Sequence, residues 1–248
     1  MCDLFTLSAG KNFSAPKSLP LFAVRASNNV DGWGIGYYKN HRAFVEKSAD
    51  RAYLPGQLHD SFQRIARVVS SRIIICHLRM RSSGPIDECH AHPFVLNFAH
   101  CDWIFAHNGR AVSIESYRSS GSIIEEAVSD SARAFEYLRD HLLAAASTAA
   151  GISPLFERLY EATGAMIHEY PGKYNYLLTN GWCLFAFTNH RQFMVLRESA
   201  HLEDGLLLTT VGKGLSNEQW LRIASPGNAR GLLLAIAGTD IILREPLR

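Results

Sequence analysis

The sequence predicts a layered α+β fold, and three observations support this. Strand-like segments dominate the first part of the chain, two helix-like segments follow, and strand-like segments fill the rest. Such segregated runs are typical of α+β domains rather than of alternating α/β folds. No repeat, linker or low-complexity tract interrupts the 248 residues. We therefore expect one domain over residues 1–248, which can bury roughly 70–75% of the surface of its unfolded chain.

Apolar, β-branched and aromatic residues predict five strands in the first part of the chain: residues 2–8, 32–38, 42–46, 72–77 and 102–107. Residues 39–41 fit a hairpin connection between the second and third of these strands. Residues 57–69 place apolar side chains at helical spacing and predict a helix. Residues 10–20 and 79–92 contain Gly, Ser and Pro without periodicity, and we expect loops there.

Two helices are predicted next. In the first, Ser129 or Asp130 is a suitable N-cap, and one apolar face carries Phe135, Leu138, Leu142 and Ala145. Residues 153–168 repeat that apolar spacing. The remaining predicted strands are residues 174–179, 182–187, 192–197, 206–211 and 231–244. Asn180-Gly181 predicts a hairpin turn between the first two of them.

Composition excludes several classes of function. The chain has 25 Lys+Arg against 23 Asp+Glu, a net charge of +2, which gives no basic surface for nucleic acid. The longest apolar runs, such as Leu232 to Ala237, are far shorter than the ~20 residues of a membrane span. No secretory signal is recognisable, so we expect a cytoplasmic protein. Five cysteines without a CxxC motif are expected to be free thiols.

Cys2 is the first candidate for chemistry. Removal of Met1, which is usual before a small residue, would place a thiol and a free α-amine on one residue. The amine has a reference pKa of ~7.7–8.0, so much of it is neutral near pH 7 and can accept the thiol proton. The alternative is that Cys2 is a small core residue, as free cysteines commonly are.

Asn108 and Gly109 follow a predicted strand within Ala106-His107-Asn108-Gly109. The side-chain amide of Asn108 and the backbone N–H of Gly109 could together donate to an oxyanion during acyl transfer. The alternative is an ordinary turn, because Asn-Gly is a common turn sequence.

Arg79 and Asp130 form a complementary pair of candidates. A guanidinium at the end of a buried strand suits recognition of a carboxylate, and a carboxylate at a helix start could hold an ammonium group. The alternatives are a surface arginine and a simple N-cap.

A cluster of cysteines and histidines around Cys89-His90-Ala91-His92 has the ligand types of a zinc site. The spacing argues against zinc, because no CxxC, HxxxH or HExxH occurs. We expect no metal and no cofactor, and we keep a metal-binding protein only as an alternative.

The order of the motifs carries a resemblance to a known family. Cys2, Asp31-Gly-Trp-Gly-Ile, His77-Leu-Arg, His92-Pro-Phe, His107-Asn-Gly and Ser129-Asp-Ser follow one another along the chain. In this order they resemble the class II glutamine amidotransferases, and more narrowly members without an attached synthase domain. Two features depart from the synthase-linked members, which typically have Trp after the arginine and a Cys-Gly start: here Met80 and Asp3 stand at those positions.

The resemblance implies an N-terminal nucleophile hydrolase fold, a four-layer αββα sandwich of two antiparallel sheets between helices. It implies that Cys2 attacks the γ-amide of glutamine to form a γ-glutamyl thioester, with Asn108 and Gly109 as the oxyanion hole. Arg79 and Asp130 would bind the α-carboxylate and the α-ammonium group, and His92 would lie beside the glutamine pocket.

Several functions remain open from the sequence. The first is a glutamine amidohydrolase that releases ammonia, with or without a separate ammonia-accepting synthase as partner. The second is a hydrolase of γ-glutamyl amides or peptides that uses the same site. Non-catalytic alternatives are a metal-binding protein and an inactive ligand sensor. The oligomeric state does not follow from the sequence.

Overall fold

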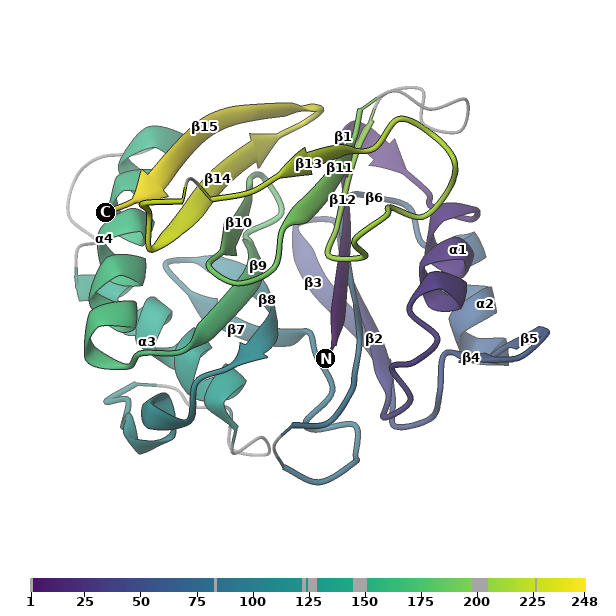
Figure 1. The fold of residues 1–248 in the computed structure, drawn as a ribbon, viewed down its shortest axis with the longest axis horizontal. Coiled ribbons are helices and arrows are strands. Elements are labelled where there is room, and N and C mark those ends of the chain that lie inside the picture. Colours follow the sequence, from purple (N-terminus) through teal and green to yellow (C-terminus); the bar gives the residue numbers. More distant parts are fainter. Residues whose placement is uncertain are drawn as a thin grey trace.

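The computed structural model describes residues 2–82, 84–121, 124, 129–144, 151–197, 205–225 and 227–248. Two sheets lie face to face in the middle of the molecule (Figure 1). The seven-stranded sheet has the order β13(Leu221–Ile223), β11(Phe193–Leu196), β12(Gly205–Thr209), β1(Asp3–Phe13), β6(Ser71–Leu78), β2(Trp33–Lys39), β3(Arg42–Ser48). The six-stranded sheet has the order β15(Asp240–Leu247), β14(Gly231–Ala237), β10(Leu184–Thr188), β9(Lys173–Thr179), β8(Cys101–Arg110), β7(Phe94–Phe98). A short ribbon pairs β4(Tyr53–Leu54) with β5(Gln57–Leu58), and all the strand pairs are antiparallel.

Helices cover the outer face of each sheet. The helices α1(Ser18–Arg25) and α2(Asp60–Val68) lie on the seven-stranded sheet, and α3(Asp130–Ala144) and α4(Ile152–Glu169) lie on the six-stranded one (Figure 1). A 3-10 turn, Val112–Ser116, follows β8. The result is the expected four-layer αββα sandwich.

The apolar layer between the two sheets determines which side chains can reach the site. It contains Leu4 from β1, Ile75 from β6, and Ile104 and Ala106 from β8. Neighbouring residues in these strands, such as Phe5, Cys76 and Phe105, pack instead against the outer helices. Because side chains alternate along a strand, His77 and Asn108 also face the space between the sheets.

Most of the predicted elements are present, but the prediction of a loop over residues 10–20 is wrong. Strand β1 continues to Phe13, and helix α1 begins at Ser18. Pro20 lies in the first turn of this helix, where a missing N–H costs nothing. Leu19, Phe22 and Ala23 bury its inner face, which shows that packing decides the structure of this short helix.

Other strands also differ from the prediction. Strands β4, β5, β7 and β13 were not expected, and all four are short; β5 takes the first two residues of the helix expected over residues 57–69. The single strand expected over residues 231–244 is two strands, β14 and β15, because Gly238 adopts a φ of +60° between them. The connection between β2 and β3 is a two-residue turn of Asn40 and His41, both with positive φ, rather than residues 39–41. The expected helical residue Ala145 lies outside the described residues.

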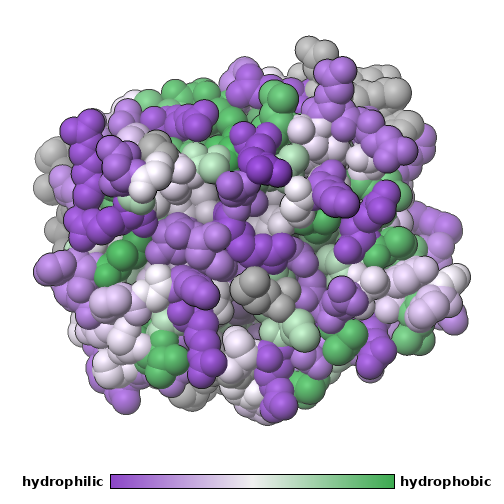
Figure 2. Space-filling view, in the orientation of Figure 1, coloured by the Kyte–Doolittle hydropathy of each residue, from purple (hydrophilic) through white to green (hydrophobic). Residues whose placement is uncertain are grey.

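None of the described helices has the length and apolar character needed to cross a membrane. Figure 2 shows hydrophilic residues spread over most of the visible face, with hydrophobic residues interspersed among them.

Candidate active site

A hollow opens at the end of the inter-sheet layer where β1 begins, and it encloses about 350 Å³ including the part open to solvent. Five of the six site residues expected from the sequence line it: Cys2, Arg79, His92, Gly109 and Asp130. The sixth, Asn108, lies beside it in β8. The hollow is also lined by His77, Met80, Ser82, His90, His107, Ser129 and Ser131. Residues from five different parts of the chain therefore meet in one place.

Cys2 stands immediately before β1, and its thiol is partly accessible rather than a core residue. Its Sγ accepts a hydrogen bond from the backbone N–H of Met80 and lies near the Met80 carbonyl oxygen, both at 3.2 Å. Burial raises the pKa of the Cys2 thiol, while the Met80 N–H and the Arg79 guanidinium oppose this effect. The thiol therefore needs a base to ionise near neutral pH.

Asn108 is 1% exposed, and its side chain faces the inter-sheet layer that also holds Leu4 of β1. Its amide Nδ2 is buried and has no hydrogen-bond partner among the described residues. Burying a donor without an acceptor costs about 1–3 kcal/mol of folding stability, so the presence of the Asn108 amide here calls for an explanation. A developing oxyanion would supply the missing acceptor.

Strand β8 continues through Asn108 and Gly109 to Arg110, so these residues pair with β9 and do not form a turn. Gly109 lies opposite Tyr174, whose N–H and carbonyl both bond to Asn189 on the β10 side. The Gly109–Tyr174 pair is therefore a non-hydrogen-bonded pair, and the N–H of Gly109 points away from β9. This N–H points to the side of β8 on which β7 lies. Gly109 itself lies past the last pair of the two strands, Phe94 with Phe105.

Gly109→Ala is expected to destabilise the protein by at least about 3 kcal/mol. A Cβ at this position would lie 1.8 Å from the carbonyl oxygen of Lys173, and a backbone oxygen cannot move without breaking the ladder. Denaturant unfolding measures the loss. Gly212→Ala is the matched control, since a Cβ there meets nothing within 4 Å. Equal stability of the two variants would contradict the close approach of β9.

Arg79 follows β6 and is 4% exposed, so it is not a surface arginine. Its backbone N–H donates to the Gly32 carbonyl and its carbonyl accepts from the Asp31 N–H, both at 2.9 Å. These bonds prolong the pairing of β2 and β6 and fix the residue at the mouth of the inter-sheet layer. Burial lowers the pKa of the guanidinium, which nevertheless stays protonated near neutral pH.

Asp130 is the first residue of α3, and Ser129 is the N-cap, since its Oγ accepts from the N–H of Ala132 at 3.2 Å. The Asp130 carboxylate accepts from the backbone N–H of Ala111 at 2.9 Å and from that of Ser131 at 2.8 Å. The carboxylate is thus held in place at the edge of the hollow, 4% exposed, as a fixed negative charge.

The His107 ring lies between Ser131, which follows Asp130 in α3, and the backbone of β9. Its Nε2 lies 3.1 Å from the Lys173 carbonyl oxygen, and its Nδ1 lies 2.8 Å from the Ser131 Oγ. A carbonyl only accepts, so Nε2 carries the proton and the Ser131 hydroxyl donates to Nδ1. Burial lowers the pKa of His107, which agrees with this neutral form.

His92 and His77 lie against each other and both line the hollow, with ring centroids 4.3 Å apart and ring planes tilted by 42°. His92 Nδ1 accepts from the backbone N–H of His107 at 3.4 Å, so its proton is on Nε2. Burial lowers the pKa of His92 well below its usual value and that of His77 to about 3. Both rings are therefore neutral near pH 7, and neither brings a positive charge to the hollow.

Sequence reasoning considered His77 and His107 only as possible ligands in the zinc alternative and gave Ser131 no role, although each adjoins a candidate within the motifs quoted above. Only their packing in three dimensions reveals them. Across the described part of the chain, no three or more His, Cys, Asp or Glu side chains are placed to hold a metal ion.

The chain matches the model of the family "Glutamine amidotransferases class-II" over residues 1–210. Curated relatives include two proteins provisionally named glutamine amidotransferases. One, from Haemophilus influenzae, is 22% identical over 80% of this chain and 67% of its own. The other, YafJ of Escherichia coli, is 24% identical over 80% of this chain and 77% of its own. An uncharacterized protein of Methanocaldococcus jannaschii is 27% identical over 77% of this chain, but the match spans only 52% of its length.

Solved structures support the fold. A predicted glutamine amidotransferase from Pseudomonas aeruginosa superposes with a TM-score of 0.66 at 18% identity, covering 98% of this chain and 100% of that one. The glutamine phosphoribosylpyrophosphate amidotransferase of B. subtilis superposes with a TM-score of 0.65 at 14% identity, covering 99% of this chain and 49% of that one. The αββα sandwich is thus the N-terminal nucleophile hydrolase fold of these domains. By its family match, the chain belongs to the class II glutamine amidotransferases.

Proposed function

We propose that this protein hydrolyses the γ-amide of glutamine through a thioester on Cys2, after removal of Met1. The observation that carries the proposal is the convergence of a partly accessible thiol, a buried guanidinium and a fixed carboxylate on one hollow. A free amino acid presents one carboxylate and one ammonium group, so Arg79 and Asp130 are complementary to its two ends. In this proposal the side chain of such a substrate reaches the thiol, which lines the same hollow.

In the proposed reaction the Cys2 sulfur attacks the carbonyl carbon of the γ-amide of glutamine while the thiol proton passes to the Cys2 α-amine. The carbonyl oxygen becomes an oxyanion that accepts from Asn108 Nδ2 and the Gly109 N–H. The ammonium form of the amine then protonates the leaving nitrogen, and the C–N bond breaks to give ammonia and the thioester. Water attacks the thioester carbonyl and gives a proton to the neutral α-amine. That proton passes to sulfur as the C–S bond breaks, which frees the thiol and releases glutamate.

The test is release of ammonia and glutamate from glutamine by protein whose N-terminal mass shows that it starts at Cys2. We expect stoichiometric release of both products. Absence of hydrolysis and of covalent capture by a glutamine-analogue electrophile would overturn the proposal. A panel of γ-glutamyl peptides decides whether the leaving group is ammonia or a larger amine. In the cell, a separate synthase would be the acceptor of the ammonia.

Arg79→Lys is expected to raise the KM for glutamine about 10- to 100-fold with a smaller change in kcat. A lysine ammonium cannot hold a carboxylate with the two-pronged geometry of a guanidinium. Steady-state kinetics measures the change. Arg81→Lys is the matched control, because Arg81 is exposed and does not line the hollow. An unchanged KM in Arg79→Lys would contradict the assigned role.

A further inference from the structure

Arg191 lies in the connection between β10 and β11, where the chain crosses from the six-stranded to the seven-stranded sheet. Its Nη1 donates to the carbonyl oxygen of Cys2 at 2.8 Å, and its Nη2 donates to the carbonyl oxygen of Thr210 at 2.8 Å. A planar guanidinium can bridge two carbonyls in a fixed geometry. Arg191 therefore ties the backbone of the proposed nucleophile to the end of β12.

The same guanidinium pairs with the residue that follows the nucleophile. Nη1 of Arg191 lies 2.9 Å from Oδ1 of Asp3, and the two side chains are 23% and 12% exposed. Oδ1 also accepts from the Thr210 hydroxyl, and Oδ2 accepts from the Asn29 amide, both at 2.8 Å. Both oxygens of the carboxylate are thus engaged, and its limited exposure reduces screening by solvent and salt.

The backbone of Arg191 is held as firmly as its side chain. The buried amide of Asn175 donates from Nδ2 to the Arg191 carbonyl at 2.7 Å and accepts at Oδ1 from the Arg191 N–H at 3.2 Å. Asn175 is a residue of β9, directly opposite Asn108. The strand next to the expected oxyanion hole therefore places the guanidinium that holds Cys2.

We infer that Arg191 and Asp3 are positioning residues for the nucleophile: they fix the main chain of Cys2 and balance the charge beside its amine. The inference rests on the function proposed above. After Met1 is removed, the amine is three covalent bonds from the carbonyl that Arg191 contacts, so the guanidinium lies within roughly 6 Å of it. The positive charge of Arg191 opposes protonation of the amine, and the negative charge of Asp3 favours it. The two effects on the pKa of the amine therefore nearly cancel.

Other titratable side chains face Cys2 from the elements around it, and all of them are unchanged in the variants tested below. Burial keeps three histidines among them neutral near pH 7. The set comprises the titratable residues that line the same hollow: His77, Arg79, His90, His92, His107 and Asp130.

The experiment measures the rate of covalent capture of Cys2 by a diazoketone analogue of glutamine as a function of pH, on protein whose N-terminal mass is verified. Capture rises with pH as the amine loses its proton. In Arg191→Gln the Asp3 carboxylate has lost its counter-charge. The midpoint of the capture-rate profile should therefore lie about one pH unit higher than in the wild type. In Asp3→Asn the Arg191 guanidinium has lost its counter-charge, so the midpoint should lie about one pH unit lower than in the wild type. The thiol responds in the same two directions, because negative charge also disfavours the thiolate.

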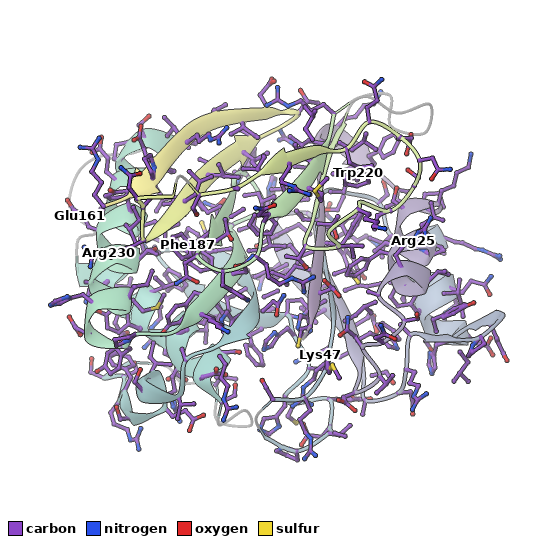
Figure 3. The ribbon with its side chains drawn as sticks, viewed as in Figure 1. Arg25, Lys47, Glu161, Phe187, Trp220 and Arg230 are labelled. Carbon is purple, nitrogen blue, oxygen red and sulfur yellow. The ribbon has the colours of Figure 1, made fainter. Side chains whose placement is uncertain are left out.

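Two further variants separate charge from geometry. Arg191→Lys keeps the positive charge but not the two-pronged contact. The midpoint of its profile should stay near that of the wild type, while the capture rate should fall at least about 10-fold. The double variant Asp3→Asn/Arg191→Gln removes both charges, so its rise should return to the wild-type pH. Arg230→Met is the control, since Arg230 is exposed, bonds to the Arg248 carbonyl and lies far from the N-terminus (Figure 3).

The outcomes distinguish the two proposals. Wild-type protein that is not captured would overturn the proposed function. Wild-type capture with profiles that move in the same direction in both single variants, or do not move, would overturn the role of the Arg191–Asp3 pair and leave the proposed function standing. If one single variant fails to fold, the other decides: a profile that moves in its expected direction supports the role of the pair, and an unmoved profile overturns it, because a purely structural role predicts no link between charge and profile.

Discussion

Replacing Cys2 with alanine is expected to reduce glutamine hydrolysis at least about 10⁴-fold and to abolish covalent capture. Removing a nucleophile leaves only the catalysis that binding and the oxyanion hole provide. The fold should survive, because Cys2 precedes β1 and, in the described part of the chain, its thiol is hydrogen-bonded to the backbone of Met80. A change in unfolding free energy below about 1 kcal/mol is expected. Ammonia release and denaturant unfolding measure the two effects.

Cys101→Ala is the matched control for this variant. Cys101 is also partly exposed, but it begins β8 at the end of the strand away from the hollow. It should keep wild-type hydrolysis and capture. Hydrolysis in Cys2→Ala that remains within 10-fold of wild type, with a verified N-terminus, would show that another group performs the attack.

Asn108→Ala is expected to lower kcat about 10²- to 10³-fold, the usual cost of losing one oxyanion donor. Its stability should stay within about 1 kcal/mol of wild type, since Nδ2 of Asn108 has no partner to lose within the described structure. Asn108→Asp should be at least as slow, because it replaces the donor with a negative charge next to the developing oxyanion. Near-normal turnover in Asn108→Ala would mean that its amide does not serve the reaction.

Asn175 provides the contrast, because it is the cross-strand neighbour of Asn108 and is equally buried. Its amide is bonded at both ends, to Arg191 and to the Thr188 hydroxyl. Asn175→Ala is therefore expected to lose roughly 1–3 kcal/mol of stability. Two asparagines in the same environment should thus separate: one matters chiefly for turnover and the other for stability.

The candidate site shows how far sequence reasoning reaches. Motif order brought Cys2, Arg79, Asn108 and Asp130 together as one hypothesis. That Asn108 faces the inter-sheet layer follows only from the structure, where pairing with β9 continues β8 past His107. Arg191 carried no such signal, because it lies 189 residues from Cys2 in a connection without a motif. Its contact with the Cys2 carbonyl exists only because β11 and β1 belong to one sheet while β10 belongs to the other.

The fold shows the same division. The period-two and 3.6-residue patterns reflect burial on one face, so they predicted the long strands and α2, α3 and α4. Helix α1 was not predicted, because its eight residues are too few to show a helical period and begin within a segment that contains Pro and Ser. Strand β8 was expected to end at His107, because Asn-Gly is common in turns, but pairing with β9 extends it to Arg110.

By itself, the sequence determined the α+β class, most of the elements, and the set of residue types that a zwitterionic amino acid requires. The tertiary structure alone decided which of them meet, that Nδ2 of Asn108 has no acceptor among the described residues, and that Arg191, paired with Asp3, donates to the carbonyl oxygen of Cys2. The physical reason is that local patterns record how a segment is buried, whereas a site depends on contacts between segments that only the packing of two sheets brings within hydrogen-bond distance.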